Sequence, residues 1–137
     1  INGNLKGVLF SNSYFKEANF QNTDISEASF ERSILDNVLF RDVDMSATYM
    51  PHVMLNFSKF YKTNLSKTNM EFSNLDNVQF DDVDLSFAKF RESKVNNTFW
   101  RDVLAFNSNF TFSVFSIDFV CRRCSGTRQK GGRRECI

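Results

Sequence analysis

The chain has 137 residues and a formal net charge of +1, which fits one ordinary domain without a strong charge preference. It has 17 Phe but only one Pro and five Gly. Without an apolar run of about 18 residues, we expect no membrane-spanning helix. Because neither a Gly-rich phosphate loop nor a nucleophile–His–acid set is visible, we expect no enzyme, catalytic residue, cofactor or small-molecule substrate.

A five-residue repeat begins near the N-terminus and continues to residue 120. One position of each five-residue unit, which we call the first register, is always apolar. A second register, two residues before the first, holds small or β-branched residues from Gly3 to Ser113 and is broken at Asp118. If about 40–45% of residues at any position are apolar, an apolar residue at every position of the first register cannot arise by chance. Every member of the first register is apolar: Leu5, Phe10, Phe15, Phe20, Ile25, Phe30, Leu35, Phe40, Met45, Met50, Leu55, Phe60, Leu65, Met70, Leu75, Phe80, Leu85, Phe90, Val95, Trp100, Ala105, Phe110, Phe115 and Val120.

A period of five matches neither a helix nor a flat strand. It requires a short extended piece and a turn that rotates the chain by about a quarter each time. Residues 35–38 (LDNV) recur at 75–78, a lag of two 20-residue coils. The sequence therefore predicts an all-β solenoid over residues 1–120 in which four pentads form one coil.

In such a coil the large residue of each pentad points to the axis and the small residue fills the corner beside it. Residues 20 apart then form inward columns. We predict a core stack about 4.8 Å apart, the usual distance between strands, formed by Phe20, Phe40, Phe60, Phe80 and Trp100, with Val120 at its end.

The two registers resemble those of the pentapeptide-repeat family over about 118 of the 137 residues. Ala18-Asn19-Phe20, Thr63-Asn64-Leu65 and Ser73-Asn74-Leu75 match the family's small–Asn/Asp–Leu/Phe core. The resemblance implies a right-handed quadrilateral parallel β-helix of about six four-sided coils.

The same resemblance implies a non-enzymatic scaffold for a protein partner. It favours a bacterial cytoplasmic protein or a module of an effector secreted into a host. One alternative is a DNA mimic that protects a type II topoisomerase (DNA gyrase). Another is the luminal repeat domain of a synaptic-vesicle transporter, in which the sequons at Asn56, Asn64, Asn96 and Asn109 would be glycosylated.

Carboxylates form the first candidate surface. Asp24, Asp44 and Asp84 share one outward column, and Asp42, Asp82 and Asp102 share the next. Carboxylates at a regular rise can imitate nucleic-acid phosphates and attract basic proteins. The other interpretation is a solvated face, because Arg41, Lys62 and Arg101 interrupt the stripe.

Apolar residues at outward positions near residue 120 form the second candidate surface. They indicate an interface with a protein partner or with a second copy through the C-terminal coil. The alternative is that residues 121–137 cover them. The residues are Phe99, Leu104, Phe106, Phe112, Val114, Ile117 and Phe119.

Residues 121–137 contain six basic residues and one acid, and also Cys121, Cys124 and Cys136. We predict a flexible tail that contacts nucleic acid or lipid or is only a linker, while the chain as a whole is not expected to bind nucleic acid directly. A typical zinc site needs four ligands; the three cysteines fall one short and the only His, His52, is distant in the sequence, so no metal is expected. The flanking arginines would make the cysteines reactive.

Overall fold

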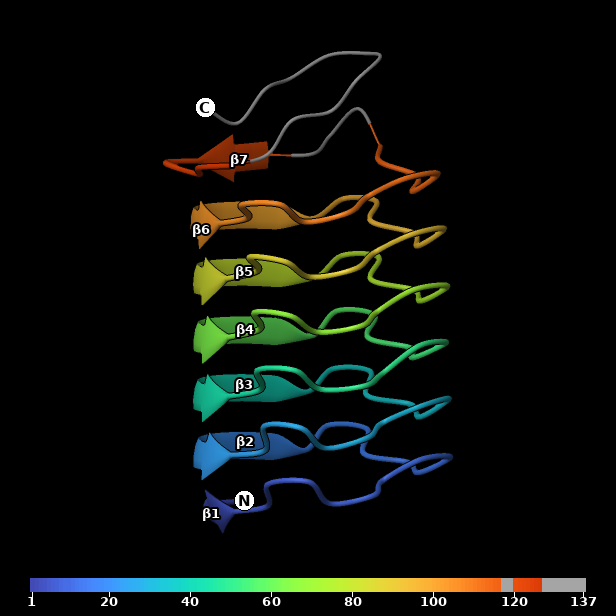
Figure 1. Ribbon diagram of the computed structural model, residues 1–137, viewed down its shortest axis with the longest axis vertical. Helices are drawn as coiled ribbons and strands as arrows, with labels where there is room; N and C mark the ends of the chain where they lie inside the picture. Colours follow the sequence, from blue (N-terminus) through green and yellow to red (C-terminus); the bar gives the residue numbers. More distant parts are fainter. Residues whose placement is uncertain (117–119, 127–137) are drawn as a thin grey trace.

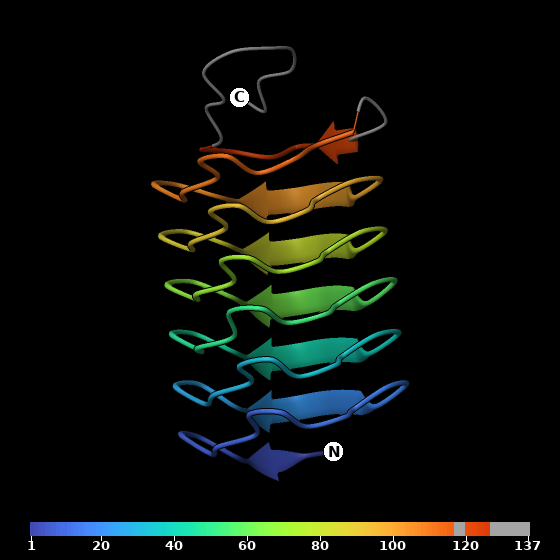
Figure 2. The ribbon, with the colours of Figure 1, turned by 90° about the vertical axis from the view of Figure 1, so that its right-hand side faces the viewer.

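A computed structural model describes residues 1–116 and 120–126. The described strands are parallel and stack in sequence order, one per coil, along a rod (Figures 1 and 2). They are β1 (Gly3–Asn4), β2 (Asn19–Asp24), β3 (Leu39–Asp44), β4 (Lys59–Asn64), β5 (Gln79–Asp84), β6 (Phe99–Leu104) and β7 (Val120–Arg122). Within the described residues, no helix is long and apolar enough to cross a membrane.

The strands pair in a register of 20 residues. Phe20 lies beside Phe40, and Phe40 beside Phe60. Isolated bridges keep the same lag on other sides of the coil, as in Leu9 with Ser29 and Tyr14 with Ile34. The predicted four-sided parallel solenoid is thereby confirmed.

Each coil has four sides, which we call A to D. On each side, the residues immediately before and after the inward residue point outward. The residue two positions after the inward residue lies at a corner. The inward residues are Leu5, Ile25, Met45, Leu65, Leu85 and Ala105 on side A; Phe10, Phe30, Met50, Met70, Phe90 and Phe110 on side B; Phe15, Leu35, Leu55, Leu75, Val95 and Phe115 on side C; and Phe20, Phe40, Phe60, Phe80, Trp100 and Cys121 on side D.

The turn at every corner comes from one residue in the left-handed backbone region. From Asn12 (φ 58°) to Phe112 (φ 59°), every fifth residue has a positive φ, and none of them is glycine. Left-handed φ is costly for most L-residues and cheapest for Gly, Asn and Asp. Burial of the adjacent inward side chains offsets this repeated local cost.

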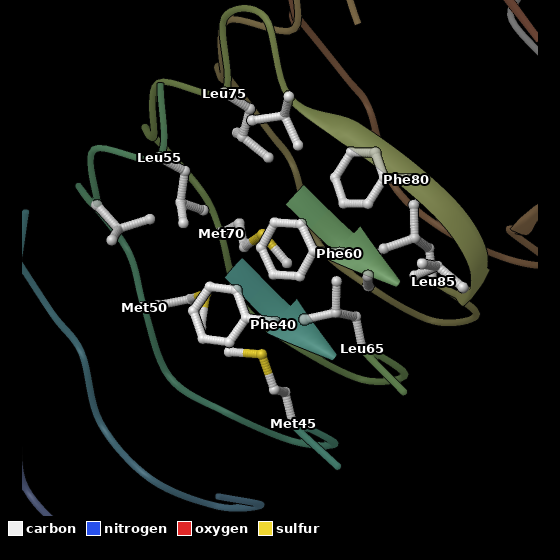
Figure 3. Packing of buried hydrophobic residues seen from close by; sticks show 14 of the residues in the cluster. Phe40, Met45, Met50, Leu55, Phe60, Leu65, Met70, Leu75, Phe80 and Leu85 are labelled. Atoms are coloured by element: carbon white, nitrogen blue, oxygen red, sulfur yellow. The ribbon is translucent and has the colours of Figure 1, made fainter. Parts of the chain in front are cut away.

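The interior contains the predicted aromatic column on side D (Figure 3). Ring centroids are 5.2 Å apart for Phe20–Phe40, 4.8 Å for Phe40–Phe60 and 5.2 Å for Phe60–Phe80, and these rings are stacked. Trp100 meets Phe80 edge-on at 5.5 Å. Sides A and C contribute aliphatic side chains such as Leu65 and Leu55, which fill the space beside the rings.

The solenoid extends beyond the predicted boundary at residue 120. In the last described coil, Trp100 pairs with Cys121 and Phe99 with Val120, a lag of 21. Val120 is therefore an outward residue, and Cys121 takes the inward place that the five-residue period assigned to Val120. Cys121 is partly buried and Cys124 is buried. One extra residue in this coil explains why counting in fives failed here, while residues 127–137 of the expected tail lie outside the described residues.

Candidate functional site

The acidic column on side A serves the local backbone. Asp24, Asp44, Asn64 and Asp84 lie side by side in adjacent strands. Each side-chain Oδ1 accepts a hydrogen bond from the N–H of the serine two residues later, at 2.8–3.0 Å. Short polar side chains commonly close such turns. The column is therefore a series of turn caps in which Asn and Asp act alike.

Asp24 shows how these hydrogen bonds affect the pKa of a carboxyl group. Its pKa lies below the ordinary value, first because the Ser26 hydroxyl donates to it at 2.7 Å and then because the Ser26 N–H donates at 2.9 Å. The nearby Lys6 ammonium acts in the same direction. A carboxylate stabilised by local donors is less available to an external basic partner.

The corner column between sides D and A contains Asp42, Asp82 and Asp102. Asp102 forms a two-pronged ion pair with Arg123, with N–O distances of 2.6 and 2.7 Å. The pairing raises the pKa of Arg123. Asp42 and Asp82 are exposed at the same corner, separated by Lys62.

The strand side itself is nearly neutral. Arg101 forms a two-pronged ion pair with Asp81, which lowers the pKa of Asp81 and raises that of Arg101. The Arg41 guanidinium lies 4.8 Å from the Tyr61 ring centroid. The acids of strands β2–β6 are Asp24, Asp42, Asp44, Asp81, Asp82, Asp84 and Asp102, and the bases of β2–β7 with the adjoining residue 123 are Arg41, Lys59, Lys62, Arg101, Arg122 and Arg123.

The candidate apolar residues lie on several sides of the rod. Leu104 and Phe106 flank the inward Ala105 on side A, while Phe99 is half-buried on side D. Phe112 lies at the corner between sides B and C, and Val114 is on side C. Phe119 and Ile117 lie outside the described residues. The structure therefore does not gather the described members of the set into one patch.

A smaller apolar group does form on and beside side A. Phe87, at the corner next to side A, donates its backbone N–H to the carbonyl of Phe106 at 2.8 Å. Phe87, Leu104 and Phe106 are 54%, 44% and 48% exposed. We call these three residues the Phe106 patch. Phe87 stands 19 residues before Phe106, a spacing of one coil minus one residue that would have indicated their proximity from the sequence.

The segment that follows β7 approaches this patch from the C-terminal end. Gly126 has φ +89°, and a Cβ added there would lie 2.7 Å from both the ring and the backbone nitrogen of Phe106. Only glycine fits such an approach. Part of Phe106 is therefore in contact with the chain's own C-terminal segment, while about half of its surface stays open.

Cys121 and Cys124 are joined by a disulfide. Cys136 lies outside the described residues. The described part of the chain contains no group of three or more His, Cys, Asp and Glu residues that could hold a metal ion. His52 is exposed and stacks on Phe72 with ring centroids 5.1 Å apart.

Comparison with solved structures gives the same fold at low sequence identity. A pentapeptide repeat protein from the Arabidopsis thaliana thylakoid lumen is 22% identical, with a TM-score of 0.56, over 74% of this chain and 67% of that one. A trypsin-treated single-residue variant of QnrB1, a plasmid-mediated fluoroquinolone resistance protein, is 13% identical, with a TM-score of 0.58, over 85% and 66%. The chain thus spans about two thirds of each of these two proteins.

A third solved structure, Rfr23 from the cyanobacterium Cyanothece 51142, is 14% identical, with a TM-score of 0.50, over 86% of this chain and 87% of that one. No curated protein sequence matches the chain. Two family models, described as pentapeptide repeats (9 copies) and pentapeptide repeats (8 copies), match residues 5–48 and residues 52–86 respectively. Together they cover more than half of the sequence, and the chain belongs to the pentapeptide-repeat family.

Proposed function

We propose that this protein is a non-enzymatic scaffold that binds a protein partner through the Phe106 patch. The observation that carries the proposal is the exposure of three large apolar side chains, Phe87, Leu104 and Phe106, on two consecutive coils. Exposed apolar groups that lie together favour a partner that removes them from water. Burying one such side chain contributes about 1.5–3 kcal/mol.

Charges beside the patch define the chemistry of that partner. Lys67 shares the corner column of Phe87, one coil below it. On the other side of the patch, Asp84 lies beside Leu104, and Arg123 is paired with Asp102. A partner surface with an apolar centre and a polar rim that places an acid opposite Lys67 would complement this arrangement.

The strand side supports the DNA-mimic alternative less well. Its seven carboxylates face six basic groups, and two of the carboxylates, Asp81 and Asp102, are held by arginines. A surface with such small net charge does not reproduce the uniform field of a phosphate backbone. We therefore assign recognition to the apolar patch.

Site-specific crosslinking tests the proposal. A photoreactive amino acid at Phe87 is compared with the same group at Ala47, which lies in the same corner column two coils away with a similar φ of 55° against 61°. We expect a crosslinked protein partner from Phe87 and not from Ala47. A product at twice the mass of the chain would identify a second copy joined through the C-terminal coils. Equal crosslinking from both positions would contradict the proposal.

A further inference from the structure

The six coils present a symmetric pattern at the edge between sides B and C. We call this edge the B–C ridge, and its levels one to six are residues 9–14, 29–34, 49–54, 69–74, 89–94 and 109–114. Its backbone is continuous, because the bridges Leu9–Ser29 and Tyr14–Ile34 repeat at every level. The ridge is distinct from the Phe106 patch, although Phe87 of that patch precedes Lys89 of level five by two residues.

Apolar side chains occupy both ends of the ridge. Leu9 and Tyr14 on level one are 80% and 67% exposed. Phe112 and Val114 on level six are 75% and 55% exposed. These are among the most exposed large apolar side chains of the described residues. Both ends therefore gain from being covered.

The centre of the ridge is aromatic. His52 on level three stacks on Phe72 on level four, with an angle of 11° between the rings. Tyr49 and Met54 flank His52 on level three, and both are exposed. The middle of the ridge thus offers a second surface that water solvates poorly.

The charges between the ends and the centre change sign across the midpoint. Level two has Glu31 followed by Arg32, which form an ion pair at 3.9 Å. Level five has Arg91 followed by Glu92, which form an ion pair at 2.9 Å. Glu31 and Arg91 share one column, and Arg32 and Glu92 share the next, because each pair is 60 residues apart. Reversing the direction of the rod therefore places each of these four charges on one of opposite sign, while Glu71, Lys89 and Lys94 face the uncharged Pro51, Ser29 and Ile34.

We propose that the B–C ridge binds a second copy of this chain in the antiparallel direction. The two-fold axis lies in the interface, crosses the rods at right angles and passes between levels three and four. Level one then meets level six: Tyr14 faces Val114 of the second copy, while Leu9 faces its Asn109 and Asn12 faces its Phe112. Glu31 meets Arg91 of the second copy, Arg32 meets its Glu92, and His52 meets its Phe72.

The parallel arrangement is less favourable. It would place level five against level five and bring Lys89 and Lys94 of both copies together. The antiparallel arrangement instead places Lys89 opposite Ser29 and Lys94 opposite Ile34. Like charges in direct opposition disfavour a wrong partner arrangement.

The size of the ridge sets the strength of the dimer. Six levels at about 4.8 Å and a contour of five residues at about 3.3 Å, which bends around the corner between the two sides, give at most about 460 Å² per copy. A standard stable interface needs about 800 Å² from each partner. The dimer is therefore weak and forms at high micromolar concentration.

Sedimentation velocity from about 20 μM to about 1 mM tests the proposal. We expect a concentration-dependent dimer that weakens at least tenfold in Glu31→Arg and in Arg91→Glu, and returns in the Glu31→Arg/Arg91→Glu double variant. Lys59→Glu on the opposite side D is the matched control and should leave the dimer unchanged. All of these positions are on the surface, and circular dichroism checks that each variant is folded.

Three results would overturn the proposal. A monomer at every concentration would do so directly. Rescue of Glu31→Arg by Arg32→Glu, rather than by Arg91→Glu, would show a parallel dimer, since Glu31 then meets Arg32 of the second copy. Loss of the dimer in Leu104→Asp, with the charge variants unaffected, would place it at the C-terminal coil.

Discussion

Asp24 accepts hydrogen bonds from both the backbone N–H and the hydroxyl of Ser26, at 2.9 and 2.7 Å. The same turn is capped by Asn64 in a later coil, whose Oδ1 accepts the N–H of Ser66 at 3.0 Å. The cap therefore requires a side-chain oxygen at that distance from the backbone, and a negative charge is not essential to it.

The first prediction distinguishes the role of the Asp24 side-chain oxygen as a hydrogen-bond acceptor from the role of its negative charge. Asp24→Asn should lower the free energy of unfolding at pH 7 by less than Asp24→Ala does, because Asn keeps the oxygen that caps the equivalent turn at Asn64 and loses only the charge. Asp24→Ala should lower it by about 1 kcal/mol, the usual net value of one hydrogen bond. Urea titrations followed by circular dichroism measure both, and equal losses would show that the charge matters.

The second prediction concerns pH. The pKa of Asp24 is lowered in the folded chain, so its contribution to stability is fully present above the ordinary Asp value of 3.8 and is lost as the pH falls through the lowered pKa. Between pH 7 and pH 3 the wild type should therefore lose more stability than Asp24→Asn. Identical pH profiles for the two proteins would contradict the assigned hydrogen bonds.

The third prediction concerns serines at the small inward position. Ser58 donates its hydroxyl to the carbonyl of Leu35 at 2.5 Å and accepts the N–H of Val38 at 3.0 Å, so it joins one coil to the turn of the coil before it. The turn that ends at Ala18 has no serine at the equivalent position of the next coil. This turn closes directly, because the Ala18 N–H donates to the Phe15 carbonyl at 2.9 Å.

Ser58→Ala should consequently cost about 1 kcal/mol and no more, because the turn can close directly after the change. Thermal unfolding measures the loss. Thr48→Ala is a useful comparison, since the Thr48 hydroxyl donates to Met45 within its own turn and links no coils. A loss of more than about 3 kcal/mol in Ser58→Ala would show that the backbone cannot relax in this way.

Much of this fold could be read from the spacing of residues, because a strict period fixes which side chains meet. Counting by 20 placed Phe20 over Phe40 and Asp24 beside Asp44, and both relationships hold in the structure. The count failed after Trp100, where one additional residue shifts Cys121 into the column. A period predicts neighbours only while no residue is inserted.

The local roles of the side chains were harder to predict. The columns of Asp24 and Asp102 were visible in the sequence, but their hydrogen bonds to Ser26 and Arg123 depend on turn geometry. The left-handed corners were missed because residues as different as His52 and Phe57 adopt them. The frequent Asn at these corners was the available indication.

The fourth prediction concerns those corners. Phe57 has φ 62° and is exposed, so it contributes little burial while it adopts a backbone conformation unfavourable for its type. Asn37 and Asn77 occupy the same corner column in the adjacent coils. Phe57→Asn should raise the free energy of unfolding by about 1 kcal/mol. The reverse change, Asn77→Phe, should lower it by a similar amount, and a gain in both would contradict the explanation.

The fifth prediction concerns the centre of the aromatic column. Phe60 is buried between Phe40 and Phe80, with ring centroids 4.8 and 5.2 Å away, so no solvent or mobile segment can fill the space it would leave. Phe60→Ala should cost about 3–5 kcal/mol, the range for emptying an aromatic site in a packed core. Lys62→Ala, at an exposed corner of the same strand β4, is the control and should change stability by less than about 0.5 kcal/mol. Because each coil packs only on its neighbours, the cavity should loosen β3 and β5 before the coils farther away. Hydrogen exchange of the backbone amides would show this gradient, and uniform loss of protection along the rod would indicate that the coils unfold as one unit.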